Sequence, residues 1–221
     1  MNPRRFRRIQ EVLGRRQPDL TVLMERVNKP NNFSAILRNC DAVGVLEAHA
    51  VLPEKAAEGN MDLHHHVSGG TAKWLRVAVH ETVEEAVTVL HDQGLAVLAA
   101  HPSPRARDYR EVDYTRPVAL MVGAELDGIS GEGLALADEA VFIPMAGMVR
   151  SLNVSVATAL LLFEAYRQRS RAGFYDAPRL DPQVYRRILF EWAHPDLARH
   201  LREQGRPYPP LSPQGEPLRD G

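Results

Sequence analysis

The chain has 221 residues, of which 44% are apolar and 25% charged, and its formal net charge is -1 at pH 7. This composition is ordinary for one folded domain with a small appendage, and it excludes wholesale disorder. No apolar run approaches the roughly 20 residues that a membrane span needs, and no apolar stretch of a signal peptide follows the basic N-terminus. Cys40 stands alone and cannot form an internal disulfide. We therefore expect a cytoplasmic protein that does not cross a membrane.

The charge is unevenly distributed along the chain. Residues 1–30 carry eight Arg and Lys against three Asp and Glu, a local net charge of +5, and residues 4–16 are expected to form a basic amphipathic helix. A second Arg-rich segment lies between residues 166 and 190. Guanidinium groups bind phosphates bidentately and release counterions from a phosphate backbone. A solvated helix face explains such charges about as well.

The middle of the chain alternates between short apolar strands and helices. Expected strands lie at 20–26, 47–52, 76–80, 95–100, 117–122 and 140–143, and expected helices at 33–43, 82–93 and 131–137. This alternation predicts an α/β fold with a parallel sheet covered on both faces. Ligands bind beyond the carboxyl ends of such strands, so the loops that begin at His101, Gly123 and Pro144 are the places to search for chemistry.

Beyond the sheet, a long apolar helix is expected from 153 to about 171, and a further helix at 181–204. The long helix has more apolar surface than one face of the sheet can cover, at Val154, Ala157, Leu160 and Leu161. Exposed apolar surface of this size indicates an interface with a second copy of the chain. The last fifteen residues contain five prolines, so this tail is expected to lack regular structure.

Several motifs favour common enzyme classes only weakly. The loop GAELDGIS at 123–130 resembles a phosphate-binding loop, but Ile129 stands where the lysine belongs. What remains is a glycine-rich turn that carries Glu125 directly after a strand. His64, His65 and His66 are consecutive and lack metal-ligand spacing, so no metal site is expected. No GxSxG elbow is present, which disfavours an ordinary hydrolase.

Two polar segments are harder to explain by packing. NNFSAILRNCDAVGV carries Asn32 and, six residues later, Arg38 in an otherwise apolar helix, and the two can approach one ligand only if Asn32 precedes that helix. IPMAGMVRSLNVSVATALLLFEA runs from a strand through a loop into the long helix. Ser151 and Asn153 would lie at this helix N-terminus, where free N–H groups favour an anion. Helix capping alone would also explain either residue.

Taken together, these segments resemble the SPOUT superfamily of RNA methyltransferases. Its three motifs match Asn32 with Arg38, then GAELDG with Glu125, then IPMAGMVRSLNVSVA with Ser151 and Asn153, in the expected order. The phrases RRQPDLTVLMERVNKP, YTRPVALMVG and RPYPP with QGE further resemble the TrmH type, the tRNA guanosine-2'-O-methyltransferases that act on the D-loop. The resemblance implies a parallel sheet with helices on both faces and a deep C-terminal trefoil knot.

The resemblance also implies a cofactor and a set of site residues. S-adenosylmethionine would be bound, bent, mainly by backbone groups of the knot loops at Ala100, Gly123, Ile143 and Leu152. Family members often have Thr in place of Ala100, so a hydroxyl contact is missing there. The family assigns Arg38 to activation of the ribose hydroxyl, although Arg normally stays protonated, which leaves phosphate positioning and alkoxide stabilisation open. The full catalytic set would be Arg38, Asn32, Glu125, Ser151 and Asn153, with Glu125 holding its loop.

The implied organisation is a basic helical extension at 1–17, a knotted methyltransferase domain at 18–172 and a helical extension with a Pro-rich tail at 173–221. The implied partners are tRNA and a second copy of the chain that completes the site. The alternatives are a ribosomal-RNA 2'-O-methyltransferase of the same fold and a knotted RNA-binding module without catalysis. The residues expected to bind tRNA outside the pocket are Arg7, Arg8, Arg15, Arg16, Arg167 and Arg169.

Overall fold

The computed structural model describes residues 2–53 and 73–218. The chain divides into two compact units, one formed by Met1–Gln17 with Phe174–Gly221 and the other by Pro18–Gly173. The three consecutive histidines at 64–66 lie outside the described residues. Within the described ranges no helix is long and apolar enough to cross a membrane.

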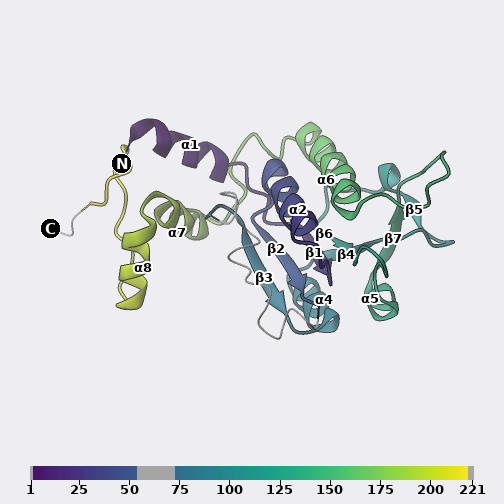
Figure 1. Ribbon diagram of the computed structural model, residues 1–221. Coiled ribbons are helices and arrows are strands. Elements are labelled where there is room, and N and C mark those ends of the chain that lie inside the picture. Colours follow the sequence, from purple (N-terminus) through teal and green to yellow (C-terminus); the bar gives the residue numbers. More distant parts are fainter. Residues whose placement is uncertain (1, 54–72, 219–221) are drawn as a thin grey trace. The chain divides into compact units, whose positions relative to one another are not determined.

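The unit Pro18–Gly173 is built on a sheet whose described strands follow the order β3-β2-β1-β6-β4-β7-β5 (Figure 1). The pairings between neighbouring strands are parallel. This arrangement confirms the expected α/β fold with a parallel sheet, while the trefoil knot stays a prediction. The strands span β1 Leu20–Glu25, β2 Glu47–Val51, β3 Arg76–His80, β4 Ala96–Ala100, β5 Arg107–Asp108, β6 Val118–Val122 and β7 Glu139–Phe142.

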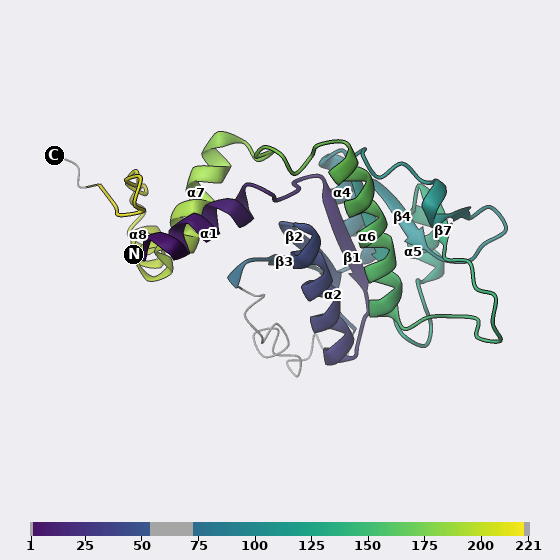
Figure 2. The ribbon, with the colours of Figure 1, turned by 90° about the horizontal axis from the view of Figure 1, so that it is seen from above.

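Helices cover both faces of this sheet. Figure 2 shows α2 (Pro30–Val43) beside α6 (Val154–Arg171), and these two helices pack together. They bury one face of β1 through Leu20, Val22 and Met24, whereas Leu23 points into a second core beneath α4 (Val83–Asp92). The helix α5 (Gly131–Leu136) packs against α4. Side chains alternate between the two faces because the strand has a period of two residues.

The strands β6, β4 and β7 are direct neighbours, and this adjacency sets the position of the site. Leu98 of β4 pairs with Leu120 of β6, and Ala100 of β4 pairs with Val141 of β7. Their carboxyl ends therefore meet at one edge of the sheet, and the loops that follow them emerge side by side.

Four elements differ from the sequence expectations. The helix α2 begins at Pro30 rather than at residue 33, since proline fits the first helical position where no N–H bond is needed. The two-residue β5 and the 3₁₀ helix η3 (Tyr109–Glu111) were not expected, because they are too short for a hydrophobic period to show. The single helix expected at 181–204 is two helices, α7 (Pro182–Ala193) and α8 (Pro195–Glu203), since Pro195 cannot continue α7.

The other unit contains α1 (Pro3–Leu13), which packs against α7, and α7 in turn packs against α8. A small core of Phe190, Ala198 and Leu201 is extended by Tyr208, whose ring stacks on Phe190 at 4.7 Å between centroids. The described part of the Pro-rich tail contains no helix or strand, as expected. It is nevertheless fixed by hydrogen bonds, such as the one that Ser212 N donates to Glu216 O at 2.8 Å.

Two arginines expected at the RNA surface are buried. Arg16 is 1% exposed and lies over the ring of Trp192, 5.3 Å from its centroid. Arg169 is 0% exposed and donates to Oδ1 of Asp19 at 2.6 Å and to the carbonyl oxygen of Tyr114 at 2.8 Å. Their guanidinium groups therefore serve the fold, and the expectation that they contact RNA is wrong.

The apolar positions of α6 divide differently from the expectation. Leu161 is fully buried in the core that α6 shares with α2, so it cannot form part of an interface. The exposed apolar side chains of this helix are Val156, Leu160, Phe163 and Tyr166.

Candidate active site

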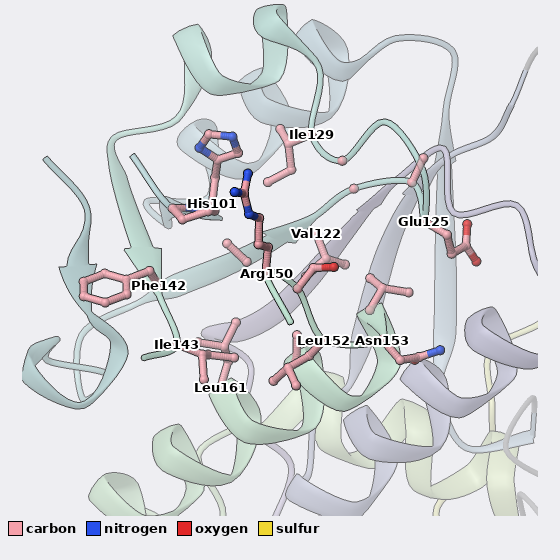
Figure 3. A pocket seen from close by; sticks show the side chains of 18 of the residues that line it. His101, Val122, Glu125, Ile129, Phe142, Ile143, Arg150, Leu152, Asn153 and Leu161 are labelled. Carbon is pink, nitrogen blue, oxygen red and sulfur yellow. The ribbon is translucent and has the colours of Figure 1, made fainter. Parts of the chain in front are cut away.

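A pocket of about 480 Å³ lies at the carboxyl ends of β4, β6 and β7 (Figure 3). Its walls come from the three loops that follow these strands and from the first turns of α6. Apolar side chains form much of the wall, among them Val141, Ile143, Leu152 and Leu161. The volume lies in the usual range of small-molecule sites, about 300–1,000 Å³. A wall of apolar side chains with a few polar groups is also typical of such sites.

The loop after β6 approaches the pocket with bare backbone. A Cβ atom added to Gly123 would lie 2.0 Å from the carbonyl carbon of Gly128, so no larger residue fits there. Gly128 has a φ of +70°, which favours glycine. Ala124 and Gly128 exchange two backbone hydrogen bonds, at 3.0 and 2.9 Å, which closes the turn. This close packing supports the loop as a site for backbone contacts with a ligand.

Hydrogen bonds join the three polar motifs at one side of the pocket. Nδ2 of Asn153 donates to Oδ1 of Asn32 at 3.1 Å, and Nδ2 of Asn32 donates to Oε1 of Glu125 at 2.7 Å. Three segments that are distant in the sequence thus meet through their side chains. We refer to Asn32, Glu125 and Asn153 as the polar junction.

Glu125 also supplies the acceptors that the start of α2 lacks. Lys29 is the N-cap of α2 and its side chain makes no capping bond. The Glu125 carboxylate instead accepts the backbone N–H of Lys29 at 3.1 Å and that of Asn28 at 3.3 Å. Partial burial acts to raise the pKa of Glu125, but these bonds and that from Asn32 outweigh it and lower the pKa. The carboxylate is therefore charged at neutral pH and complements the positive end of the helix.

Asn153 has a matching role at α6. It is the N-cap of that helix, and its Oδ1 accepts the backbone N–H of Ser155 at 2.9 Å. Nδ2 of Asn39 on α2 donates to the carbonyl oxygen of Ser155 at 3.1 Å, which ties the two helices together near the pocket. Oδ1 of Asn153 therefore caps α6, while Nδ2 of the same side chain donates to Asn32 in the polar junction.

The structure brings most of the expected site residues to this pocket. Glu125, Ser151 and Asn153 line it, and Asn32 reaches it through the polar junction. The four residues expected to bind the cofactor also all line the wall: Ala100, Gly123, Ile143 and Leu152.

Arg38 is the exception among the expected catalytic residues. Asn32 lies inside α2 and not before it, so Arg38 follows about 9 Å further along the helix and roughly 120° around it. Its side chain is exposed, does not line the pocket and makes no hydrogen bond or ion pair with the residues that the structure describes. Within one chain the two residues therefore do not converge on one ligand.

Three polar residues line the pocket without having been expected there, namely Lys29, His101 and Arg150. Two of them stand next to residues that the sequence does assign to the site, since His101 follows Ala100 and Arg150 precedes Ser151. The sequence singles out the loop that begins at His101 but gives that side chain no role, because the direction of each loop side chain depends on the fold.

Comparisons with known proteins agree with this geometry. A model of the SpoU rRNA Methylase family matches residues 19–163, and a model of the SpoU rRNA methylase C-terminal region matches residues 167–220. A tRNA (guanosine(18)-2'-O)-methyltransferase of Thermus thermophilus is 58% identical over 188 residues, which cover 85% of this chain and 95% of the relative.

Solved structures extend the likeness to three dimensions. The crystal structure of a TrmH/SpoU tRNA modifying enzyme from A. aeolicus matches with a TM-score of 0.79 and 39% identity, covering 88% of this chain and 97% of its own. The SpoU methyltransferase AviRb from Streptomyces viridochromogenes, crystallised with AdoMet, matches with a TM-score of 0.61 and 26% identity, covering 70% and 62%. The expected resemblance is thereby confirmed, and the chain belongs to the SpoU methylase family.

Proposed function

We propose that this protein transfers a methyl group from S-adenosylmethionine to the ribose 2'-hydroxyl of the D-loop guanosine at tRNA position 18. The observation that carries the proposal is the polar junction beside a pocket with a glycine backbone wall. The 58% identical relative is named for this reaction, and the likeness spans 95% of its length. A tRNA substrate would also place the protein in the cytoplasm.

The pocket fits the proposed cofactor on its own features. Its apolar wall suits the adenosine group, and the tight turn at Gly123 and Gly128 leaves backbone groups within reach of a ligand. We propose that Ala100, Gly123, Ile143 and Leu152 hold S-adenosylmethionine. When bound, the cofactor supplies a methyl group activated by the positive sulfonium.

The chain's own polar residues would orient the RNA. Within the polar junction, Asn32 holds Asn153 at the N-terminus of α6, and Ser151 lies two residues earlier. N–H groups and the helix dipole favour phosphate at such an end. Because arginine side chains in general are poor proton acceptors, we assign Arg38 to holding the ribose phosphate and stabilising negative charge on the 2'-oxygen. Glu125 would position Asn32 and the start of α2 without contacting substrate.

The position of Arg38 supports a homodimer. Because Arg38 does not line the pocket of its own chain, a second copy is needed for an arginine from α2 to reach the pocket. The apolar face of α6 offers the surface, since Val156, Leu160 and Phe163 recur at helical spacing and are exposed. Met148 in the loop before α6 is 99% exposed, and such apolar surface beside a site usually marks an interface. We propose that this face pairs with the same face of a second copy.

The basic surface outside the pocket is proposed to hold the rest of the tRNA. Arg7, Arg8 and Arg15 are exposed in the N-terminal segment, and Arg167 is exposed on α6. Arg167 donates to Oε1 of Glu164 at 2.5 Å, so its charge is partly neutralised. Arg8 makes a longer contact with Glu11, at 3.5 Å, and the N-terminal arginines are the stronger candidates.

Mass mapping tests the reaction. Purified protein is incubated with labelled S-adenosylmethionine and either unmodified tRNA or ribosomal RNA, and the products are digested and sequenced by mass spectrometry. We expect one methyl group on the ribose of guanosine 18 in the tRNA. A label found only in ribosomal RNA would favour the rRNA methyltransferase alternative, and RNA binding without any label would favour the non-catalytic module.

Light scattering tests the dimer. One chain has a mass of 24.7 kDa, and we expect the wild type to show twice this mass at micromolar concentration. The variant Phe163→Asp should shift to the mass of the monomer. The exposed Leu197→Asp, in the other unit, is the control that should leave the mass unchanged. A monomeric wild type would contradict the proposal.

A further inference from the structure

Two side chains of the pocket wall, His101 and Arg150, have no part in the mechanism above. Figure 3 shows the Arg150 guanidinium directed toward the His101 imidazole, while Glu125 and Asn153 lie on the other side of the pocket. Nδ1 of His101 is buried and has no hydrogen-bond partner among the described residues. Buried polar atoms nearly always have a partner, so this nitrogen has an unused position that a ligand or a water molecule can fill.

The charges around the pocket narrow the identity of that ligand. Within the described part of the chain, its ionisable lining residues are Lys29, His101, Glu125 and Arg150. The Glu125 carboxylate is already used by three N–H donors. Lys29 lies at the start of α2, next to Glu125. Arg150 makes no hydrogen bond or ion pair with the described residues, so it is the cation available at the His101 side.

S-adenosylmethionine brings a matching pair of groups. Beyond the adenosine it carries an amino-acid group, with a carboxylate that needs a cationic donor and an ammonium that needs an acceptor once water is displaced. We propose that Arg150 and His101 bind this amino-acid group, Arg150 through the carboxylate and Nδ1 of His101 through the ammonium. The inference rests on the proposed use of S-adenosylmethionine and adds the residues that select its amino-acid end.

Two ligands that differ at the amino-acid group test the proposal without turnover. S-adenosylhomocysteine carries that group, whereas 5'-methylthioadenosine lacks it and retains the adenosine. Isothermal titration on the RNA-free protein measures the dissociation constant of each. For Arg150→Gln we expect binding of S-adenosylhomocysteine to weaken about 10- to 100-fold, the loss for a charge-assisted bond. Binding of 5'-methylthioadenosine should remain within twofold of the wild type.

Further variants sharpen the comparison. Arg150→Lys keeps the charge and should recover part of the affinity for S-adenosylhomocysteine. His101→Phe keeps a ring of similar size and should weaken S-adenosylhomocysteine alone. The control is Arg105→Gln, an exposed arginine that does not line the pocket, which should change neither constant.

Three results would overturn the inference. Equal loss of both ligands in Arg150→Gln would mean that Arg150 shapes the pocket. Unchanged binding of both, together with weaker tRNA binding, would assign Arg150 to an RNA phosphate. A wild type that binds neither ligand would remove the cofactor itself, and this failure is distinct because it appears before any substitution.

Discussion

Nδ2 of Asn32 donates to Oε1 of Glu125 at 2.7 Å across 93 residues of sequence. Asn32 lies in the first turn of α2, and Glu125 lies in the loop after β6. Because the same carboxylate accepts the backbone N–H groups at the start of α2, the loop and the helix are positioned by one side chain. Perturbation of Glu125 should therefore affect both the fold and the site.

Removal of the Glu125 carboxylate provides the first test. We expect Glu125→Ala to lower the free energy of unfolding by about 1 kcal/mol, the usual cost of a lost N-terminal cap. We also expect slower methyl transfer, because Asn32 and Asn153 lose their fixed orientation. Urea unfolding and a tRNA methylation assay measure the two effects. Asp127→Ala, an exposed residue of the same loop, is the control. Equal stability and turnover in Glu125→Ala and the control would contradict the positioning role.

Arg38 allows catalysis to be separated from cofactor binding. Because it does not line the pocket, Arg38→Ala should leave the dissociation constant of S-adenosylhomocysteine unchanged. Methyl transfer should fall by more than about 100-fold, the lower range for a positioned catalytic group. Single-turnover assays and titration calorimetry report these quantities separately. Turnover near the wild-type rate would exclude Arg38 from the mechanism.

Arg169 and Arg167 lie two residues apart on α6 and should behave in opposite ways. The buried Arg169 donates to Asp19 and to the backbone oxygen atoms of Tyr114 and Arg116. Arg169→Met removes the donor of these three hydrogen bonds and the charge that faces Asp19, so we expect a loss of about 3 kcal/mol in unfolding free energy. Arg167→Gln should change stability by about 1 kcal/mol or less, since Arg167 is exposed and Glu164 keeps the hydrogen bond from Gln168. Similar denaturation midpoints for both would show that the Arg169 network contributes little.

The exposed arginines of α1 are expected to act through phosphate charge. The double variant Arg7→Gln with Arg8→Gln should weaken tRNA binding across many sequences. Each lost contact should also reduce the slope of log affinity against log salt by roughly 0.7–0.9. Affinity for S-adenosylhomocysteine should stay unchanged, because neither residue lines the pocket. An unaltered salt slope would identify these arginines as a solvated helix face.

Local sequence patterns predicted most strands and helices of the unit Pro18–Gly173. The partners of individual polar side chains could not be predicted, because they come from distant parts of the chain. The apolar strands and the N-cap Thr82, whose hydroxyl accepts the N–H of Glu85 at 3.1 Å, are encoded within a few residues of sequence. By contrast, Arg169 sits in an Arg-rich run that reads as a basic surface. Its burial depends on Asp19, 150 residues away. The contacts of the polar junction could not be predicted for the same reason, because hydrogen bonds between distant residues produce no periodic pattern in the sequence.

The last prediction concerns a buried histidine pair in the sheet. Nδ1 of His49 on β2 and Nε2 of His80 on β3 lie 2.9 Å apart. Both side chains are buried, and Nδ1 of His80 lies 3.6 Å from Oε1 of Glu85 on α4. Burial, and to a lesser extent the neighbouring His80, lower the pKa of His49 from 6.5 to about 4. His49 is therefore neutral in the folded protein at neutral pH.

This pKa difference makes stability depend on pH in a defined direction. The unfolded chain binds a proton at His49 below pH 6.5 and the folded chain only near pH 4, so stability is complete above pH 6.5 and falls as the pH is lowered toward 4. Between pH 7.5 and 5 we expect His49 to account for a loss on the order of 2 kcal/mol. His49→Gln retains a donor for His80 and removes the titration, so its unfolding free energy should change less over this range. Urea unfolding at both pH values measures the difference, and equal pH dependence in wild type and variant would contradict it.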